Sequence, residues 1–170
     1  MAASDPTTTG ELRAELLRRW DEPSDAERGA WAGFLRAHSR ITKALDRELA
    51  AAHDLPLSEY DVLVQLALTE DGRLRMSDLA DAIVLSPSGL TRLVDRLAGR
   101  GLLRRERCDA DSRVVYAAIT EAGFEKLLET TPTHLDGIRR LFWDHLSDAQ
   151  KAELATIVGC LGRPRDGKPS

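Results

Sequence analysis

Two short helical patterns followed directly by two strand-like runs fill the stretch from Arg73 to Thr120, and this order constrains the fold more than any other feature. The second helical pattern opens with Ser86, a good N-cap residue, and Pro87, which suits the first helical position. Its apolar residues recur every three or four positions and form one face: Leu90, Leu93, Val94 and Leu97. Gly99 and Gly101 supply the stop signal, so the segment predicts an amphipathic helix.

The preceding pattern, Ser77 to Val84, has its own small apolar face and a tight link to the second helix through Leu85 and Ser86. Two short helices joined in this way predict a helix-turn-helix, whose second helix enters the major groove of DNA. The polar face of that helix carries Ser88, Gly89, Thr91, Arg92, Asp95 and Arg96. Its small residues allow a close approach to base edges, and Arg92 can reach a guanine or a phosphate. Taken alone, the segment also fits an ordinary amphipathic surface helix.

The strand-like runs, Leu102 to Cys108 and Arg113 to Ile119, flank a turn of Asp109, Ala110, Asp111 and Ser112. They predict a β-ribbon, or wing, and Arg73 to Met76 predicts a short third strand beside it. From residue 86 to 113 the chain has seven Arg and four acidic residues, whereas its overall net charge is −4. A basic strip on an acidic protein indicates a polyanion partner, although a solvated charged hairpin is the alternative.

These residues carry a family resemblance. The run from Leu85 to Gly123 is similar to the recognition helix, wing and next helix start of the MarR family of transcription regulators. The matching motifs are Ser86-Pro87-Ser88, Thr91 to Leu97, Asp111-x-Arg113 and Thr120-Glu121-Ala122-Gly123, and the resemblance covers roughly residues 27–162. It implies a dimeric winged-helix regulator that a small ligand or oxidation releases from DNA.

The predicted fold is mainly α, with a winged helix-turn-helix lobe of three short strands at 57–120 and dimerisation helices at 27–53 and 121–162. Residues 1–26 are expected to form an extension, with a disordered tail to about residue 8 and a short helix around Leu12 to Trp20, and 163–170 to form a tail. The short helix either docks on a partner subunit or is a frayed tail. Ser58 is expected to cap the helix that runs to Leu68, and Pro132 to kink or break the helix over 121–146. Ser147 with Gln150 predicts a capping box for a last helix.

The predicted partners are double-stranded DNA, a second copy of the chain and a small aromatic or phenolic effector. The residues expected to contact DNA are Ser86, Pro87, Ser88, Gly89, Thr91, Arg92, Arg96, Arg105, Arg107, Asp111 and Arg113. We expect Asp111 to orient Arg113 and Arg113 to enter the minor groove. Apolar surface on the terminal helices indicates pairing of two chains about a two-fold axis. A dimeric protein-interaction module without sequence-specific DNA binding is the alternative function.

An effector crevice is predicted from Trp31, Phe34, His38 and Tyr60, which combine apolar bodies with polar tips. The same side chains could instead form a dimer core. Cysteine is absent from 27–40, where the oxidation-sensing relatives carry a reactive one, so Cys108 is interpreted as a bystander thiol despite its arginine neighbours. The sequence identifies neither the effector nor the target genes.

Catalysis is not expected, because the chain has no glycine-rich phosphate loop, HExxH or GxSxG motif. The four His and two Cys have no metal-like spacing, so no metal or other cofactor is predicted. No apolar run approaches membrane-spanning length and no secretory signal is evident, so we expect a cytoplasmic, nucleoid-associated protein.

Overall fold

The computed structural model describes residues 6–83, 87–107 and 114–161, and the chain divides into two compact units, 1–40 and 41–170. The first unit holds helix α1 (Pro6–Asp21) and the first part of α2 (Asp25–His53). Pro6 stands at the first helical position, which it suits, so the helix begins inside the segment expected to be disordered.

A reciprocal cap starts α2. The Glu27 amide donates to Ser24 Oγ over 3.3 Å, and the Ser24 amide donates to the Glu27 carboxylate over 2.8 Å. The Ser24 hydroxyl also donates to the Glu27 carboxylate over 2.7 Å. This bond and, after it, the one from the Ser24 amide hold the pKa of Glu27 below its ordinary value. The guanidinium of Arg28 donates to the backbone carbonyls of Trp20 and Asp21, so the short link between the two helices is closed by polar contacts.

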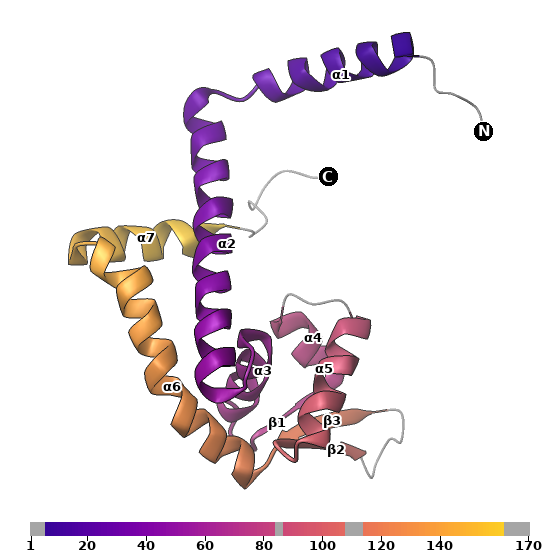
Figure 1. Ribbon diagram of the computed structural model, residues 1–170, viewed down its shortest axis with the longest axis vertical. Helices are drawn as coiled ribbons and strands as arrows, with labels where there is room; N and C mark the ends of the chain where they lie inside the picture. The colour runs from indigo at the N-terminus through magenta and orange to yellow at the C-terminus, as the bar shows by residue number, and fades with distance from the viewer. Residues whose placement is uncertain (1–5, 84–86, 108–113, 162–170) are drawn as a thin grey trace. The chain divides into compact units, whose positions relative to one another are not determined.

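The second unit contains the remainder of α2 and all later elements (Figure 1). They are α3 (Leu57–Ala67), β1 (Arg73–Arg75), α4 (Met76–Ala82), α5 (Pro87–Gly99), β2 (Leu103–Arg107), β3 (Val115–Ile119), α6 (Glu121–Leu141), the 3₁₀ turn η1 (Trp143–His145) and α7 (Asp148–Cys160). The strands form one antiparallel sheet in the order β1-β3-β2. The predicted mainly helical winged-helix fold, with its three short strands, is therefore confirmed.

We call residues 57–119, from α3 to β3, the winged lobe. Its core is apolar and closed, with large side chains from α3, α4, α5 and the sheet fully buried: Leu63, Leu66, Leu79, Leu90, Leu93, Val94, Leu97, Leu103 and Ile119. The face of α5 predicted from the sequence is the face that packs here. Gly101, with φ of +72°, ends the turn after α5 and leads directly into the sheet.

The sheet register separates two faces. One row across the three strands consists of Arg73, Ala118 and Arg104. Two residues further along, on the same face of the sheet, another row consists of Arg75, Tyr116 and Glu106. Arg105 pairs with Ala117 and Leu74 in the row between them, on the opposite face toward α5. Arg104 and Arg105 therefore have different surroundings, although they are adjacent in the sequence.

Two helix boundaries differ from the predictions. Pro56, not Ser58, is the N-cap of α3, and the Leu57 amide donates to Asp46 Oδ1 of α2 over 2.9 Å, so a distant side chain replaces the local cap. Helix α6 continues through Pro132, so the expected break does not occur, and the alternative, a kink, stays a prediction. Pro132 is exposed, so water can satisfy the Leu128 carbonyl that has no N–H donor there. The capping box of Ser147 and Gln150 at α7 is confirmed.

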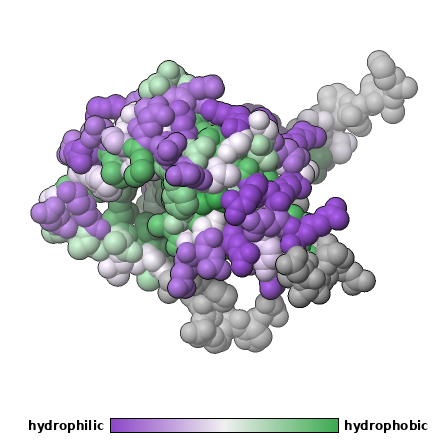
Figure 2. Space-filling model, turned by 90° about the horizontal axis from the view of Figure 1, so that it is seen from below, coloured by the Kyte–Doolittle hydropathy of each residue, from purple (hydrophilic) through white to green (hydrophobic). Residues whose placement is uncertain are grey.

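Large apolar side chains remain at the surface outside the winged lobe, and hydrophobic areas are visible on the face in Figure 2. On α6 and α7 the exposed ones are Phe124, Leu128, Leu135, Ile157, Val158 and, just after α7, Leu161. On α1 and the start of α2 they are Leu12, Leu16, Leu17, Trp20, Trp31, Phe34 and Leu35. Large apolar side chains exposed in such number on one helix or two neighbouring helices are typical of an interaction surface.

Candidate nucleic-acid interface

Helix α5 presents a polar face to solvent because its apolar face is anchored in the core. Ser88, Thr91 and Arg92 are exposed, while Gly89 is half-buried in the same turns. Arg92 makes no hydrogen bond or ion pair to any part of the chain that the structure describes. A long cation without an internal partner, next to small polar residues at a helix start, is the geometry that reads base edges.

Glu59 of α3 holds two arginines that are four residues apart: Arg96 on α5 and Arg100, which directly follows α5. Arg96 Nε donates to Glu59 Oε1 over 3.0 Å, and Arg100 Nη1 donates to Glu59 Oε2 over 2.9 Å. Arg100 also lies 3.5 Å from Asp54. Arg96, which was predicted to contact DNA, therefore has an internal carboxylate partner as well.

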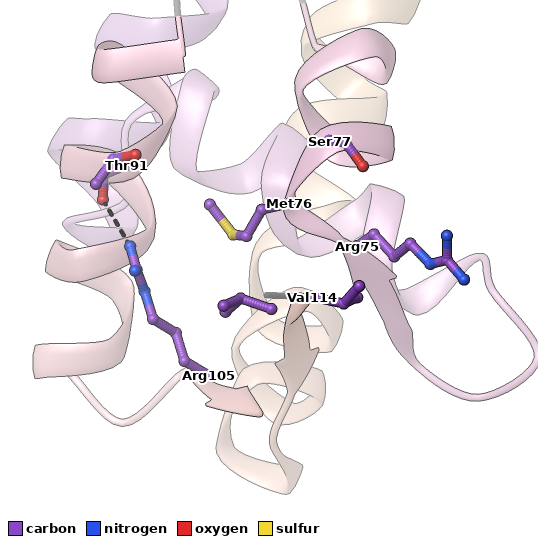
Figure 3. Close-up of a pocket in the computed structure, with 7 residues that line it drawn as sticks. Arg75, Met76, Ser77, Thr91, Arg105 and Val114 are labelled. Atoms are coloured by element: carbon purple, nitrogen blue, oxygen red, sulfur yellow. Dashed lines mark hydrogen bonds between the residues drawn. The ribbon is translucent and has the colours of Figure 1, made fainter. Parts of the chain in front are cut away.

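Arg105 of β2 bridges the wing and α5. Its guanidinium lies 2.9 Å from Asp95 Oδ1 and donates over 3.4 Å to the Thr91 carbonyl (Figure 3). A hollow of about 360 Å³ lies beside this contact, between α5, the start of α4 and the strands, and its lining includes Met76 and Ser77. The predicted DNA contact Arg105 is thus placed to fix the wing strand against the recognition helix.

On the outer face of the sheet, two arginines share one carboxylate. Arg104 donates to Glu106 over 2.7 Å, and Arg73 lies 3.5 Å from the same carboxylate. The guanidinium of Arg73 also lies 5.2 Å from the centre of the Tyr116 ring, within cation–π range. Arg107, further along β2, is exposed and has no partner among the described residues.

Several residues of the predicted interface lie outside the described residues: Ser86, Asp111 and Arg113. The same holds for Cys108, and for the side chain of Pro87, whose backbone begins α5. The orientation of Arg113 by Asp111 therefore stays a prediction.

The motif Thr120-Glu121-Ala122-Gly123 forms the joint between the sheet and α6. Thr120 Oγ accepts from the Gly123 amide over 3.1 Å as the N-cap, and donates to the Gly101 carbonyl over 2.7 Å. A Cβ on Gly123 would stand 2.1 Å from the Leu102 carbonyl oxygen, so a side chain is excluded there. The motif joins the wing to α6 by close backbone packing.

The four residues predicted to line an effector crevice fall into two groups. Trp31, Phe34 and His38 stack along α2 in the first unit, with ring centres 6.2 and 6.4 Å apart. Tyr60 is buried in the second unit, where its ring centre lies 4.4 Å from that of His134. Burial of His134 lowers the pKa of its imidazole. The crevice stays a prediction.

Sequence reasoning missed Glu59, and a usable signal was present. Val62, Leu63 and Leu66 follow it at i+3, i+4 and i+7, so Glu59 occupies a position on the apolar face of α3. A charged residue at such a position is buried and needs a partner, and Arg96 and Arg100 are the partners here.

The described part of the chain offers neither a metal-binding cluster nor a helix fit to span a membrane. No group of three or more His, Cys, Asp or Glu side chains among the described residues could hold a metal ion. None of the described helices is long and apolar enough to cross a membrane.

The chain is similar in sequence and in structure to known proteins of one family. A sequence profile of the MarR family matches residues 53–114. AbsC, a MarR family transcriptional regulator from Streptomyces coelicolor, is 34% identical with a TM-score of 0.74, over 80% of this chain and 91% of AbsC. Sco3205, a MarR family regulator from the same organism solved in complex with DNA, is 31% identical with a TM-score of 0.78, over 87% and 95%.

Among curated proteins, the transcriptional repressor MprA of Escherichia coli K12 is 33% identical over 99 residues, 58% of this chain. The chain spans a little over half of MprA, 56% of its length. The chain belongs to the MarR family and is a winged-helix transcription regulator, so the resemblance inferred from its motifs is confirmed.

Proposed function

We propose that this protein binds duplex DNA in a sequence-specific manner as a homodimer and represses transcription until a small aromatic or phenolic ligand releases it. The proposal rests on the difference between the arginines around α5 that are paired with a carboxylate and the one that is not. Arg92, beside the exposed Ser88 and Thr91, has no partner among the residues that the structure describes, whereas Arg96, Arg100 and Arg105 are each paired with a carboxylate. One cation is thus left available at the end of the helix that carries small polar residues.

The comparisons support each part to a different degree. Sco3205, which aligns over 87% of this chain and 95% of its own, was solved in complex with DNA. MprA is named a transcriptional repressor. Ligand binding by structural neighbours, such as BpsR of Bordetella bronchiseptica with 6-hydroxynicotinic acid, supports an effector only by likeness of fold. All of these proteins are regulators, which supports a non-enzymatic role.

Pairing of two chains is supported by the exposed apolar residues of α6 and α7, which a second copy would cover. A two-fold dimer places two recognition helices in successive major grooves. The operator is then an inverted repeat with half-sites about ten base pairs apart, centre to centre. Footprinting on the DNA upstream of its own gene, with the oligomeric state measured in parallel, tests this arrangement; a single asymmetric half-site bound by a monomer contradicts it.

Direct readout is tested with Arg92→Ala. Loss of a bidentate base contact weakens operator binding by about 1–3 kcal/mol and random-DNA binding much less. Arg104→Ala is the matched control, because it removes the same charge from the outer face of the sheet, where Glu106 already neutralises it. Both affinities are measured by titration at one salt concentration. Equal losses on operator and random DNA would mean that Arg92 contacts only phosphate.

A further inference from the structure

The carboxylate of Glu59 is buried in the winged lobe, although it carries charge. Glu59 is only 3% exposed and lies in the first turn of α3, where the partial positive charge of the helix start favours an anion. Burying a carboxylate is costly unless its oxygens are hydrogen-bonded to cations. One oxygen accepts from Arg96 of α5 and the other from Arg100, which directly follows α5.

The two contacts hold α5 at two points. Oε1 accepts from Arg96 and Oε2 from Arg100, and these arginines are one helical turn apart. Apolar packing of Leu93 and Leu97 attaches α5 to the core, but apolar contacts have little directionality. Charge-assisted hydrogen bonds are short and directional, so a paired grip of this kind fixes both the rotation of the helix and its position along its axis.

A small rotation of α5 would displace the residues that face DNA. Thr91 and Arg92 lie about one turn before Arg96 on the same rigid helix. Hydrogen bonds to base edges require donor–acceptor distances of about 2.7–3.2 Å, so a shift of less than 1 Å is enough to lose them. Phosphate attraction is long-ranged and tolerates such a shift.

We propose that Glu59 is a positioning residue for sequence recognition, and that Arg96 acts by holding α5 rather than by contacting DNA. The inference rests on the proposed function, because it assumes that α5 reads an operator. It assigns to a buried residue of α3 a role in specificity and not in general DNA affinity.

Glu59→Gln tests the inference, with Glu48→Gln as its matched control. Glu48 of α2 lies 2.6 Å from Arg140 of α6, away from α5. Each variant loses one negative charge; Glu59→Gln loses two arginine–carboxylate pairs and Glu48→Gln loses one. The readout is the ratio of operator to random-DNA affinity, measured well below the unfolding transition of each variant. We expect Glu59→Gln to lower this ratio about tenfold, and Glu48→Gln to leave it at the wild-type value.

Equal ratios for the two variants would overturn the inference. If the wild-type protein prefers no operator over random DNA, the proposed function itself has failed. A wild-type preference that Glu59→Gln leaves intact overturns only the role of Glu59.

Arg96→Gln keeps the inference testable if Glu59→Gln does not fold, because the Arg96 side chain is 57% exposed and its loss leaves no cavity. A positioning role lowers the affinity ratio and leaves the salt dependence of binding unchanged. A phosphate contact instead lowers the salt slope by about one ion per chain on operator and random DNA alike. In the Glu59→Gln/Arg96→Gln double variant, the losses should not add, since both changes break the same contact.

Discussion

The winged lobe and the two C-terminal helices, α6 and α7, differ in how far their large apolar side chains are exposed to solvent. In the lobe, residues such as Leu66, Leu79 and Leu97 are completely buried, and among the lobe's described large apolar side chains Leu68 is the exposed one, at 77%. On α6 and α7, Leu128 is 76% exposed and Ile157 is 50% exposed. The lobe satisfies its apolar surface within one chain, whereas α6 and α7 do not.

This difference separates the folding stability of a single chain from the stability of an association between chains. The lobe has a core of its own, so substitutions there should change the free energy of unfolding of the chain. The exposed residues of α6 and α7 contribute little to a single chain and gain their value only when another surface covers them. Substitutions in the two regions should therefore be detected by different measurements.

The largest expected effect comes from Leu97→Ala in α5. Leu97 is fully buried among the core residues, and removing its methyl groups leaves a cavity beneath the recognition helix. We expect a loss of about 2–5 kcal/mol in the free energy of unfolding. Urea unfolding followed by far-UV circular dichroism, at one protein concentration, measures it.

Leu68→Ala is the control within the same lobe, since its side chain is exposed, and it should change stability by no more than about 0.5 kcal/mol. Comparable losses for the two variants would show that burial in one chain does not govern the stability of the lobe.

The same contrast explains which features were predictable from the sequence. The start of α5 at Pro87, its end before Gly101 and the cap of α7 at Ser147 depend on neighbours within a few residues, and all three were predicted correctly. The cap of α3 comes from Asp46, eleven residues before Leu57, so the local rule that favoured Ser58 failed.

Contacts between residues far apart in the sequence could not be predicted from its local patterns. Glu59 meets Arg96 and Arg100 across 37 and 41 residues of sequence, and no spacing rule links positions so far apart. The pairing of Arg105 with Asp95 likewise depends on how the wing folds back on α5. Sequence patterns therefore identified the elements that carry the site, but did not separate arginines that hold the site from arginines that are available to a ligand.

A smaller effect is expected from Ile157→Asp on α7. A charge in the middle of a covered apolar surface should weaken pairing of two chains about tenfold or more, since residues central to interfaces contribute about 1–2 kcal/mol. The helical content of each chain should stay at the wild-type level, because Ile157 is half exposed in one chain. Sedimentation equilibrium measures the association.

Leu68→Asp introduces the same charge at an exposed leucine of the lobe and should leave association unchanged. Wild-type association of the α7 variant would remove α7 from the pairing surface and weaken the contrast between the two regions.

The smallest effect is expected from Asp61→Asn, which tests how well the lobe excludes water at α3. Asp61 is half-buried in a hollow that Lys43 and Asp46 also line, and burial raises the pKa of its carboxyl above the ordinary value of 3.8. As pH rises from 3.8 to the folded-state pKa, the folded chain keeps a proton that the unfolded chain has released. Stability therefore falls with rising pH across that window and is constant above it.

Asn carries no charge, so the substitution should remove this loss. We expect the Asn variant and the wild type to be equally stable below pH 3.8, and the variant to be more stable at pH 7 by less than about 0.5 kcal/mol, because solvent screens a half-exposed group. Free energies of unfolding measured between pH 3 and 7 give the comparison. A variant less stable than the wild type at pH 7 would mean that Lys43 stabilises the ionised carboxylate, and that this edge of the lobe is held by charge rather than by apolar packing.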